Sequence, residues 1–248
     1  SIGFNSYRGF ESLSLRHNIE YSMNKPKVIH WFRQDLRLLD NPALFEASTN
    51  NTILPIYILD DKNPEELSMG SASRLWLHHS LNSLNKSLDQ KLSIFNGNPI
   101  EIILEIIDRL DIEEIYWNRC YEPWRIKRDT LIKKELESKG VKVKTFNGSL
   151  LWEPWTIKKG DGTPYRVFTP FYRKGCLLSE EPRRPLSSPI NLELMGDTKN
   201  TNNIDDLSLL PSQKWGNEMK SFWDIGENGA NTRLKEFLDN GVENYKEG

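Results

Sequence analysis

The sequence predicts an α/β fold in which helices cover a doubly wound, five-stranded parallel sheet. Short apolar runs alternate with longer segments of helical periodicity between residues 27 and 146. The run ILPIYIL at 53–59 is apolar without interruption, as in strands that are buried on both faces. The spacing between the runs leaves room for helices, and it therefore favours right-handed βαβ units over hairpins.

The first predicted strand covers residues 28–32 and ends in a dense polar loop. A short helix is expected at 42–48, because proline suits a first helical position and either Asp40 or Asn41 can cap it. The second strand is predicted at 53–59, the continuous apolar run. These three elements form the first strand–helix–strand step of the sheet.

A longer helix is predicted after the stretch SMGSAS, where Ser71 or Ser73 is the expected N-cap. Its leucines recur at steps of four, three and four, a stripe that predicts packing on a sheet: Leu77, Leu81, Leu84 and Leu88. The third strand is predicted at 92–95.

Asn98 and Pro99 mark the start of the next helix, with Glu101 three residues after the asparagine cap. Its buried face is predicted to consist of Ile102, Ile103, Ile106, Ile107 and Leu110. The remaining elements are a strand at 113–117, a helix from about 124 to 139 that ends at Gly140, and a strand at 141–146.

The regular alternation ends near residue 147, and seven of the thirteen prolines lie between 147 and 211. We interpret 151–211 as a long surface connector. Its aromatic segments at 150–155 and 165–173 are expected to pack on another part of the protein. Helical periodicity returns at 212–248, which we interpret as the first helices of a further, incomplete domain.

Residues 1–22 are polar and lack sustained periodicity. Met23 follows them, so we interpret this segment as a non-native or disordered extension ahead of the natural start. A transit peptide is the alternative, but Glu11 and Glu20 argue against it, because such peptides are poor in acidic residues.

The composition is that of an ordinary globular protein, with 37% hydrophobic and 27% charged residues. No apolar run approaches the length that crosses a bilayer. A net charge of −2 means that a nucleic-acid partner would have to meet a local patch. Only two cysteines, far apart in the sequence, favour reduced thiols. We therefore expect a cytoplasmic, monomeric protein without membrane contact.

No motif of a nucleophile with a general base is present, and we predict no catalytic residue within this chain. The histidines do not predict a metal site either. His30 alternates within a strand and is interpreted as a hydrogen-bonded core residue. His78 and His79 are neighbours on a helix and are expected to face different directions.

Polar side chains follow three of the predicted strands and define a candidate ligand site. Because parallel strand ends share one edge of a doubly wound sheet, these groups are expected to rim one crevice. They are Asp40, Asn41, Asp60, Asn118 and Glu122. The alternative is purely structural: Arg33 and Arg37 pair with neighbouring acids, and one residue before the helix is its cap. Periodicity alone names no ligand.

Four blocks in the sequence resemble the DNA photolyase/cryptochrome family in order and spacing. They are HWFRQDLRLLDNPAL (30–44), NRCYEPWRIKRD (118–129), FNGSLLWEPW (146–155) and TPYRVFTPFYR (163–173). A weaker match, WDIGENGANTRLKEFLDNGVENY (223–245), is similar to the helices that lead into the FAD domain of that family. The resemblance therefore covers nearly everything from Met23 to Arg173.

The resemblance implies that residues 23–150 form a Rossmann-like antenna domain, which holds a light-harvesting chromophore. Family members bind FAD in a C-terminal helical domain, and photolyases use it to split pyrimidine dimers in damaged DNA. This chain ends before the FAD-binding helices would come. It is therefore expected to be inactive alone, as the N-terminal part of a photolyase.

One departure from the family concerns folate. In folate-binding members an Asn-Glu pair that grips the pterin follows the conserved Glu after two and three residues. Here those places after Glu122 hold Trp124 and Arg125. The resemblance thus implies a flavin or deazaflavin antenna, a folate held atypically, or an empty site. Trp124 or Arg125 would stack on or pair with the chromophore.

Two further functions stay open from the sequence. One is a cryptochrome-type blue-light photoreceptor with the same architecture and no repair activity. The other is a stand-alone nucleotide- or chromophore-binding module, which exposed aromatic residues near 215–237 would argue against.

Overall fold

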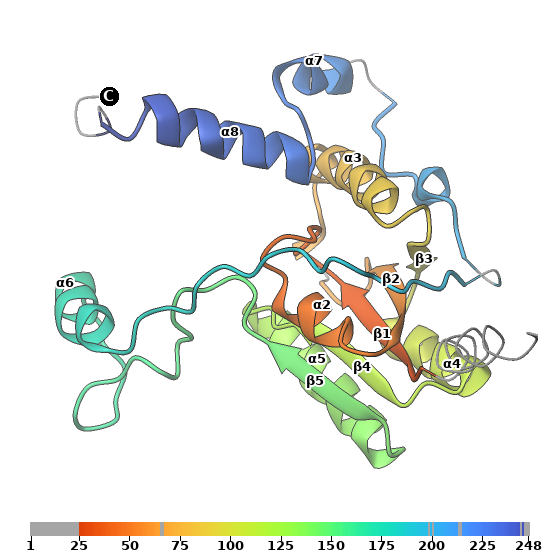
Figure 1. Ribbon diagram of the computed structural model, residues 1–248, viewed down its shortest axis with the longest axis horizontal. Coiled ribbons are helices and arrows are strands. Elements are labelled where there is room, and N and C mark those ends of the chain that lie inside the picture. The colour runs from red at the N-terminus through yellow and green to blue at the C-terminus, as the bar shows by residue number, and fades with distance from the viewer. Residues whose placement is uncertain are drawn as a thin grey trace, which may run out of the picture.

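Five parallel strands form one sheet in the order β3-β2-β1-β4-β5 (Figure 1). The computed structural model describes residues 25–64, 67–197, 199, 201–212, 215–243 and 245. The predicted extension 1–22 lies outside them. The strands are β1 (Lys27–Phe32), β2 (Thr52–Leu59), β3 (Ser93–Asn96), β4 (Glu114–Asn118) and β5 (Lys142–Phe146). The predicted doubly wound parallel sheet is therefore confirmed.

The central strand β1 pairs with β2 on one side and with β4 on the other. Val28 lies opposite Ile53 of β2, and Ile29 lies opposite Ile115 of β4. The chain builds the sheet outward from β1 to β3, then returns past β1 to add β4 and β5. The carboxyl ends of β1 and β4 consequently form the topological switch point, the place where open α/β sheets bind ligands.

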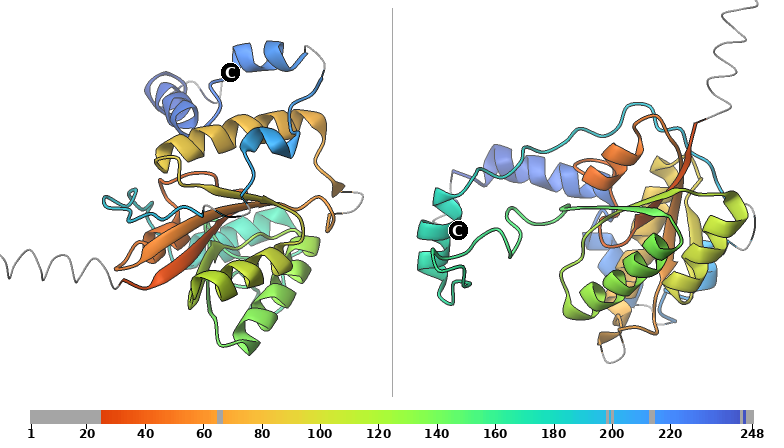
Figure 2. Two further views of the ribbon diagram at one scale, coloured as in Figure 1. Left: turned by 90° about the vertical axis from the view of Figure 1, so that its right-hand side faces the viewer. Right: turned by 90° about the horizontal axis from the view of Figure 1, so that it is seen from below.

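Helices cover both faces of the sheet (Figure 2). They are α2 (Pro42–Ala47), α3 (Ser71–Ser87), α4 (Pro99–Leu110) and α5 (Pro123–Ser138). Side chains of α2 and α3 pack in the core on one face, and those of α4 and α5 pack in the core on the other. Each connection between parallel strands is thus a crossover through a helix.

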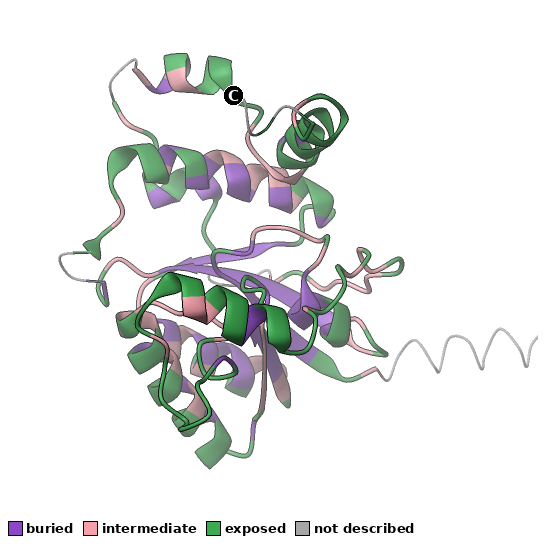
Figure 3. Cartoon of the chain, turned by 90° about the vertical axis from the view of Figure 1, so that its left-hand side faces the viewer, coloured by how far each residue is buried: buried purple, intermediate pink, exposed green. Residues whose placement is uncertain are grey.

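The two core layers contain the residues that periodicity selects. All four leucines of the predicted stripe on α3 are buried. On α4, Ile103, Ile106 and Ile107 are buried, while Ile102 and Leu110 are partly buried against the same cluster. In Figure 3 the buried residues concentrate in the sheet and on the helix faces that touch it. Burial of apolar area, at about 25 cal/mol per Å², is the main force that holds these layers together.

Helix starts follow the sequence signals at two of three sites. Asn41 caps α2, accepting a hydrogen bond from Leu44 N at 3.1 Å. Asn98 is the N-cap of α4, although its amide bonds the Glu101 carboxylate and not the backbone. The prediction of a serine cap for α3 is wrong. Gly70 is the N-cap, because Arg74 N already bonds Gly70 O at 3.0 Å.

The second half of the connector returns to the sheet. Ile53 N donates to Glu193 O at 2.8 Å, and Met195 N donates to Ile53 O at 2.9 Å. The 3-10 helix η4 (Ile204–Leu207) buries both of its end residues in the core beneath α3. This part of the connector therefore belongs physically to the α/β body.

The first half of the connector projects away from the sheet (Figures 1 and 2). It contains α6 (Phe168–Pro170), η2 (Phe171–Gly175) and η3 (Cys176–Leu178). Leu151 is 71% exposed and Phe168 is 73% exposed. The packing expected for the segments 150–155 and 165–173 is therefore incomplete within the described part of the chain.

Two helices follow the connector, α7 (Trp215–Phe222) and α8 (Glu227–Asn240). The start of α8 packs on α3, whereas its apolar residues Leu234 and Leu238 are 55% and 59% exposed. Phe222 is 74% exposed. No helix in the described ranges combines the length and the apolar composition that a bilayer crossing requires.

The histidines differ from their predicted settings. His30 is fully buried, as expected, but neither ring nitrogen has a hydrogen-bond partner within the described chain. Burial lowers the pKa of His30 to about 4, so the ring is neutral at pH 7. His78 and His79 do not point apart, since their ring centroids lie 5.1 Å from each other. Among the described residues no cluster of His, Cys, Asp or Glu could hold a metal ion.

Glu114 stabilises the pairing of β4 with β5. Burial raises the pKa of Glu114, but hydrogen bonds from Tyr116, Lys142 and Lys144 outweigh it and lower the pKa to about 2. This stabilisation is present above the unfolded-state pKa of about 4.5 and is lost as the pH falls through 2.

We expect Glu114→Gln to cost about 1–2 kcal/mol at pH 7, after allowing for screening by water at the exposed lysines. Urea unfolding of both proteins between pH 7 and pH 2 measures this cost, which should shrink toward zero at the acid end. Glu137→Gln, in an exposed pair with Lys133, is the matched control and should cost less than about 0.5 kcal/mol. A cost that is independent of pH would contradict the assignment.

Candidate functional site

A cavity of about 1030 Å³ lies at the carboxyl ends of β1, β2 and the β4–α5 turn. The predicted crevice at the switch point is therefore present. Residues at the start of α8 complete its wall, so segments far apart in the sequence contribute. The lining includes Trp31, Arg33, Arg37, Asp40, Tyr57, Asp60, Asp61, Trp76, Glu122, Trp124, Arg125, Arg128, Gly226, Glu227, Ala230 and Asn231.

Aromatic side chains reach the cavity from both faces of the sheet. Trp76 comes from α3 and Trp124 from α5, helices that cover opposite faces. Tyr57, near the end of β2, is buried, and burial raises its pKa, so its hydroxyl stays neutral. Indoles that enter from two sides suit a planar, polycyclic ligand.

Guanidinium groups alternate with indoles along one wall. The Arg125 guanidinium lies 4.5 Å from the Trp124 ring centroid, and Arg128 lies 5.1 Å from Trp124 and 5.1 Å from Trp31. Arg33 continues the series at 5.0 Å from Trp31. Cation–π contacts of this kind are strongest where water is excluded, and they hold Trp124 in one orientation beside the cavity.

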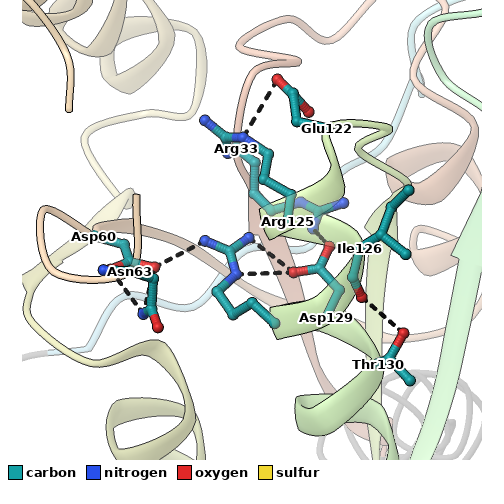
Figure 4. Close-up of polar contacts among 9 residues, drawn as sticks. Arg33, Asp60, Asn63, Glu122, Arg125, Ile126, Asp129 and Thr130 are labelled. Carbon is teal, nitrogen blue, oxygen red and sulfur yellow. Dashed lines mark hydrogen bonds and ion pairs between the residues drawn. The ribbon is translucent and has the colours of Figure 1, made fainter. Parts of the chain in front are cut away.

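Asp60 is a counter-ion inside this wall. Arg128 bonds Asp60 at 3.0 Å and Asp129 at 2.8 Å. Asp129 also pairs with Arg33, and Asp60 accepts hydrogen bonds from Asn63 at 2.8 and 2.9 Å (Figure 4). The carboxylate of Asp60 is therefore already bonded by the protein, and it holds Arg128 in the cavity wall.

Glu122 and Arg125 face the cavity at its rim. Gln34 donates to the Glu122 carboxylate at 2.7 Å, and Arg125 Nε lies 3.4 Å from it. Partial burial raises the pKa of Glu122, but backbone hydrogen bonds, Gln34 and Arg125 together bring it below its usual value. The rim therefore carries the Glu122 carboxylate beside the Arg125 guanidinium, whose central carbon lies over the Trp124 ring.

Asp40 also lines the cavity, in a turn with a left-handed backbone (φ 50°). Its carboxylate accepts hydrogen bonds from Leu186 N at 3.1 Å and from Arg183 at 2.5 Å. Burial alone would raise the pKa of Asp40. The hydrogen bonds from Arg183 and the Leu186 amide outweigh burial and bring the pKa below its usual value, so the carboxyl group is ionised. Asp40 thus attaches the returning connector to the cavity rim.

Asn41 and Asn118 do not line the cavity. Asn118, 3% exposed, donates to Asp35 at 2.5 Å and to Asn41 at 2.7 Å, and it accepts from Ala43 N at 3.2 Å. The backbone at Gly148 passes directly above it, where a Cβ would lie 2.5 Å from Asn118 Cγ. The side-chain amides of Asn41 and Asn118 therefore make their hydrogen bonds within the protein, in the corner that supports the polar loop after β1.

The structure thus brings five of the seven predicted residues to one cavity: Asp40, Asp60, Glu122, Trp124 and Arg125. Their role in cofactor binding stays a prediction. The sequence reasoning missed Trp76, Tyr57, Arg128 and Glu227 as lining residues. Tyr57 carries a hydroxyl in an otherwise apolar strand, a signal that was available. Nothing local in the sequence marks Glu227.

Comparison with known proteins identifies the family. A family model for DNA photolyase matches residues 28–189. The chain is 34% identical over 232 residues to a deoxyribodipyrimidine photo-lyase from Agrobacterium fabrum, covering 92% of this chain and 48% of that protein. It is 31% identical to cryptochrome-2 of Arabidopsis thaliana, covering 88% of this chain and 37% of the cryptochrome. The chain therefore spans less than half of either relative.

Solved structures of photolyases are similar to this chain as well. A class III photolyase from Agrobacterium tumefaciens superposes with a TM-score of 0.82 at 33% identity, covering 91% of this chain and 47% of that one. An archaeal photolyase from Sulfolobus tokodaii, whose two FAD molecules imply a novel light-harvesting cofactor, gives a TM-score of 0.60 at 25% identity. The match covers 75% of this chain and 42% of the archaeal photolyase chain. The sheet, the cavity at its switch point and these matches together place the chain in the DNA photolyase family.

Proposed function

We propose that this chain is the light-harvesting N-terminal part of a deoxyribodipyrimidine photo-lyase. The observation that carries the proposal is the cavity at the switch point, with Trp76 and Trp124 entering from opposite faces of the sheet. When bound there, an antenna chromophore would absorb light and pass its energy to FAD. The residues of this chain bind and orient the chromophore.

The cavity fits a chromophore of this class in size and chemistry. Its volume of about 1030 Å³ is at the upper end for small-ligand pockets. Trp124 would stack on the planar ring, while Arg125 and Arg37 offer positive charge to phosphate or carboxylate groups. A ring system with an anionic tail therefore matches the lining better than a neutral, compact ligand.

A flavin or deazaflavin is the proposed antenna, with a folate held in an atypical manner as the alternative. The places of the family's pterin-gripping pair are occupied by Trp124 and Arg125, which pack on each other at 4.5 Å. The Sulfolobus tokodaii photolyase, whose two FAD molecules imply a novel light-harvesting cofactor, supports a flavin as the antenna.

The proposed organisation assigns residues 23–150 to the antenna domain, 151–211 to the interdomain connector and 212–248 to the start of a helical FAD domain. Damaged DNA is the proposed partner of the whole protein, mainly through that further domain. The exposed apolar residues of α7 and α8 support a role for these helices in a larger helical unit. A monomeric state and a cytoplasmic location are part of the proposal, and the buried free thiols of Cys120 and Cys176 support the location in a reducing compartment.

Binding of FMN tests the antenna proposal directly. The purified chain should bind FMN saturably, with quenching of flavin fluorescence as the ring approaches an indole. Trp124→Ala should weaken binding by roughly 5- to 150-fold, because stacking on one aromatic side chain contributes about 1–3 kcal/mol. Trp155→Ala, half-exposed and outside the cavity lining, is the matched control and should leave the affinity unchanged.

Methenyltetrahydrofolate and a deazaflavin should be titrated beside FMN. Tight binding of the folate alone would favour the atypical folate site. Failure of all three probes, with a folded protein by circular dichroism, would refute a self-sufficient antenna site in this chain.

A cryptochrome-type photoreceptor is the second candidate, favoured by the 31% identity to cryptochrome-2. The discriminating experiment uses the natural polypeptide that carries this segment, loaded with FAD. Under blue light a photolyase splits thymine dimers in an irradiated oligonucleotide, whereas a photoreceptor binds flavin and leaves the dimers intact.

A further inference from the structure

We propose that Glu227 is a positioning residue that couples the cavity to helix α8, so that a ligand in the cavity and the docking of α8 stabilise each other. The choice of ligand rests on the proposed antenna function, whereas the contact itself does not. Three features carry the inference: the double hydrogen bond made by Glu227, the position of α8 in the cavity wall, and the position of the bonded loop in the same wall.

The Glu227 carboxylate bonds two successive backbone amides of the loop after β1. Leu38 N donates to one oxygen at 2.8 Å, and Leu39 N donates to the other at 2.7 Å. The two segments lie 188 or more residues apart in the sequence. Hydrogen bonds that a carboxylate accepts from backbone N–H groups are charge-assisted and roughly twice as strong as neutral ones.

The first turns of α8 form part of the cavity wall through Gly226, Glu227, Ala230 and Asn231. The start of α8 also lies close to α3. A Cβ at Gly226, which has a φ of +125°, would lie 2.3 Å from Ser83 Oγ on α3. A ligand that touches this wall therefore touches α8 itself.

The bonded loop lines the same cavity as the start of α8. Its Leu36, Arg37, Leu39 and Asp40 line the cavity. Arg37 fixes the loop internally, donating to Leu39 O at 3.0 Å and to Asp40 O at 2.9 Å. Because the loop is one hydrogen-bonded unit, a shift of its cavity side would move the Leu38 and Leu39 amides that Glu227 holds.

A simpler account is that Glu227 only complements the dipole at the start of its own helix. That role would need no partner outside α8. Instead both carboxylate oxygens accept from the loop, at distances of normal strong hydrogen bonds. Reciprocity then follows: if docked α8 favours the ligand-binding form of the loop, ligand must favour docked α8 by the same factor.

Amide hydrogen exchange of the ligand-free, 248-residue chain tests the contact. In Glu227→Gln, the Leu38 and Leu39 amides and the first turns of α8 should exchange at least tenfold faster, and together. Glu236→Gln on the same helix, where Glu236 pairs with the exposed Arg233, is the matched control and should leave them unchanged. The β1 amides report that the variant is folded. Unchanged exchange in Glu227→Gln, or faster exchange in α8 without the loop, would overturn the proposal.

A second measurement tests the coupling with FMN as the probe. Saturating FMN should slow exchange in the first turns of α8 in the wild type, and Glu227→Gln should abolish most of this protection. The same substitution should weaken FMN binding severalfold, while Glu236→Gln should not. If FMN binds but leaves α8 exchange unchanged, the coupling is refuted although the antenna site stands. If FMN does not bind, the flavin proposal fails, and the ligand-free exchange alone decides whether Glu227 joins loop and helix.

Discussion

Replacing Arg128 with methionine is expected to lower the free energy of unfolding by about 3–5 kcal/mol. The Arg128 side chain is 7% exposed, and its partners Asp60 and Asp129 are 5% and 13% exposed. Removal of the guanidinium leaves Asp60 buried without a cation, and one partner of a buried ion pair is costly alone. The contacts with the rings of Trp31 and Trp124 are lost as well.

Equilibrium unfolding in urea measures this loss. Lys133→Met on the same helix, in an exposed pair with Glu137, is the matched control and should cost no more than about 0.5 kcal/mol. Adding Asp60→Asn to Arg128→Met should recover part of the stability, because the unpaired carboxylate is then gone. A loss below about 1 kcal/mol in Arg128→Met would show that water solvates Asp60.

The same substitution should loosen Trp124, which Arg128 holds from one side. The Arg128 side chain therefore contributes both to the stability of the fold and to the shape of the cavity. A ligand-binding defect in Arg128→Met is for this reason not evidence of direct contact, and Trp124→Ala is the cleaner probe of the cavity.

Local patterns were enough to predict the elements of the fold. Continuous apolar runs identify β1 and β2 because both faces of a parallel sheet are buried. The pair Asn98 and Pro99 marks the start of α4, because capping depends on adjacent residues. The serine cap of α3 failed at Gly70 because several residues in that stretch can cap, and tertiary packing selects among them.

The site was predictable only in outline. Strand ends can be located from periodicity, so the crevice and residues such as Glu122 follow from the topology rule. Which polar groups face a ligand depends on partners far away in the sequence. Asn118 bonds Asp35 across 83 residues, and Arg128 bonds Asp60 across 68. A single sequence contains no pairwise information of that kind, so a buried support such as Asn118 looks the same as a rim residue.

Asn118→Asp separates these two roles, because it keeps the shape of the side chain and adds a charge. Asn118 donates to the Asp35 carboxylate at 2.5 Å, so the substitution places two carboxyl groups together in a buried corner. We expect a loss of about 3–5 kcal/mol in the free energy of unfolding at pH 7. If Asn118 served only a ligand, stability would hardly change.

The loss should depend on pH with a defined sign. Burial and the neighbouring carboxylate raise the pKa of the new carboxyl group in the folded protein, above about 3.9 in the unfolded chain. Between these two values the folded state binds the additional proton, so stability relative to wild type falls as pH rises, by up to about 1.4 kcal/mol per pH unit. Unfolding measured at pH 4.5 and pH 7 should therefore show the smaller difference at pH 4.5.

Asn147→Asp is the matched control for this series. The Asn147 side-chain oxygen accepts from the backbone of Ser149 at 3.2 Å and of Leu150 at 2.9 Å, bonds that a carboxylate makes equally well. The substitution removes only the donation from the Asn147 amide to Leu150 O at 2.7 Å, at an exposed position where water can replace it. Its expected cost is below about 1 kcal/mol and independent of pH over the same range. Equal behaviour of the two variants would mean that water reaches the corner at Asn118. The polar loop after β1 would then be held in place by Arg37 and Glu227, and not by Asn118.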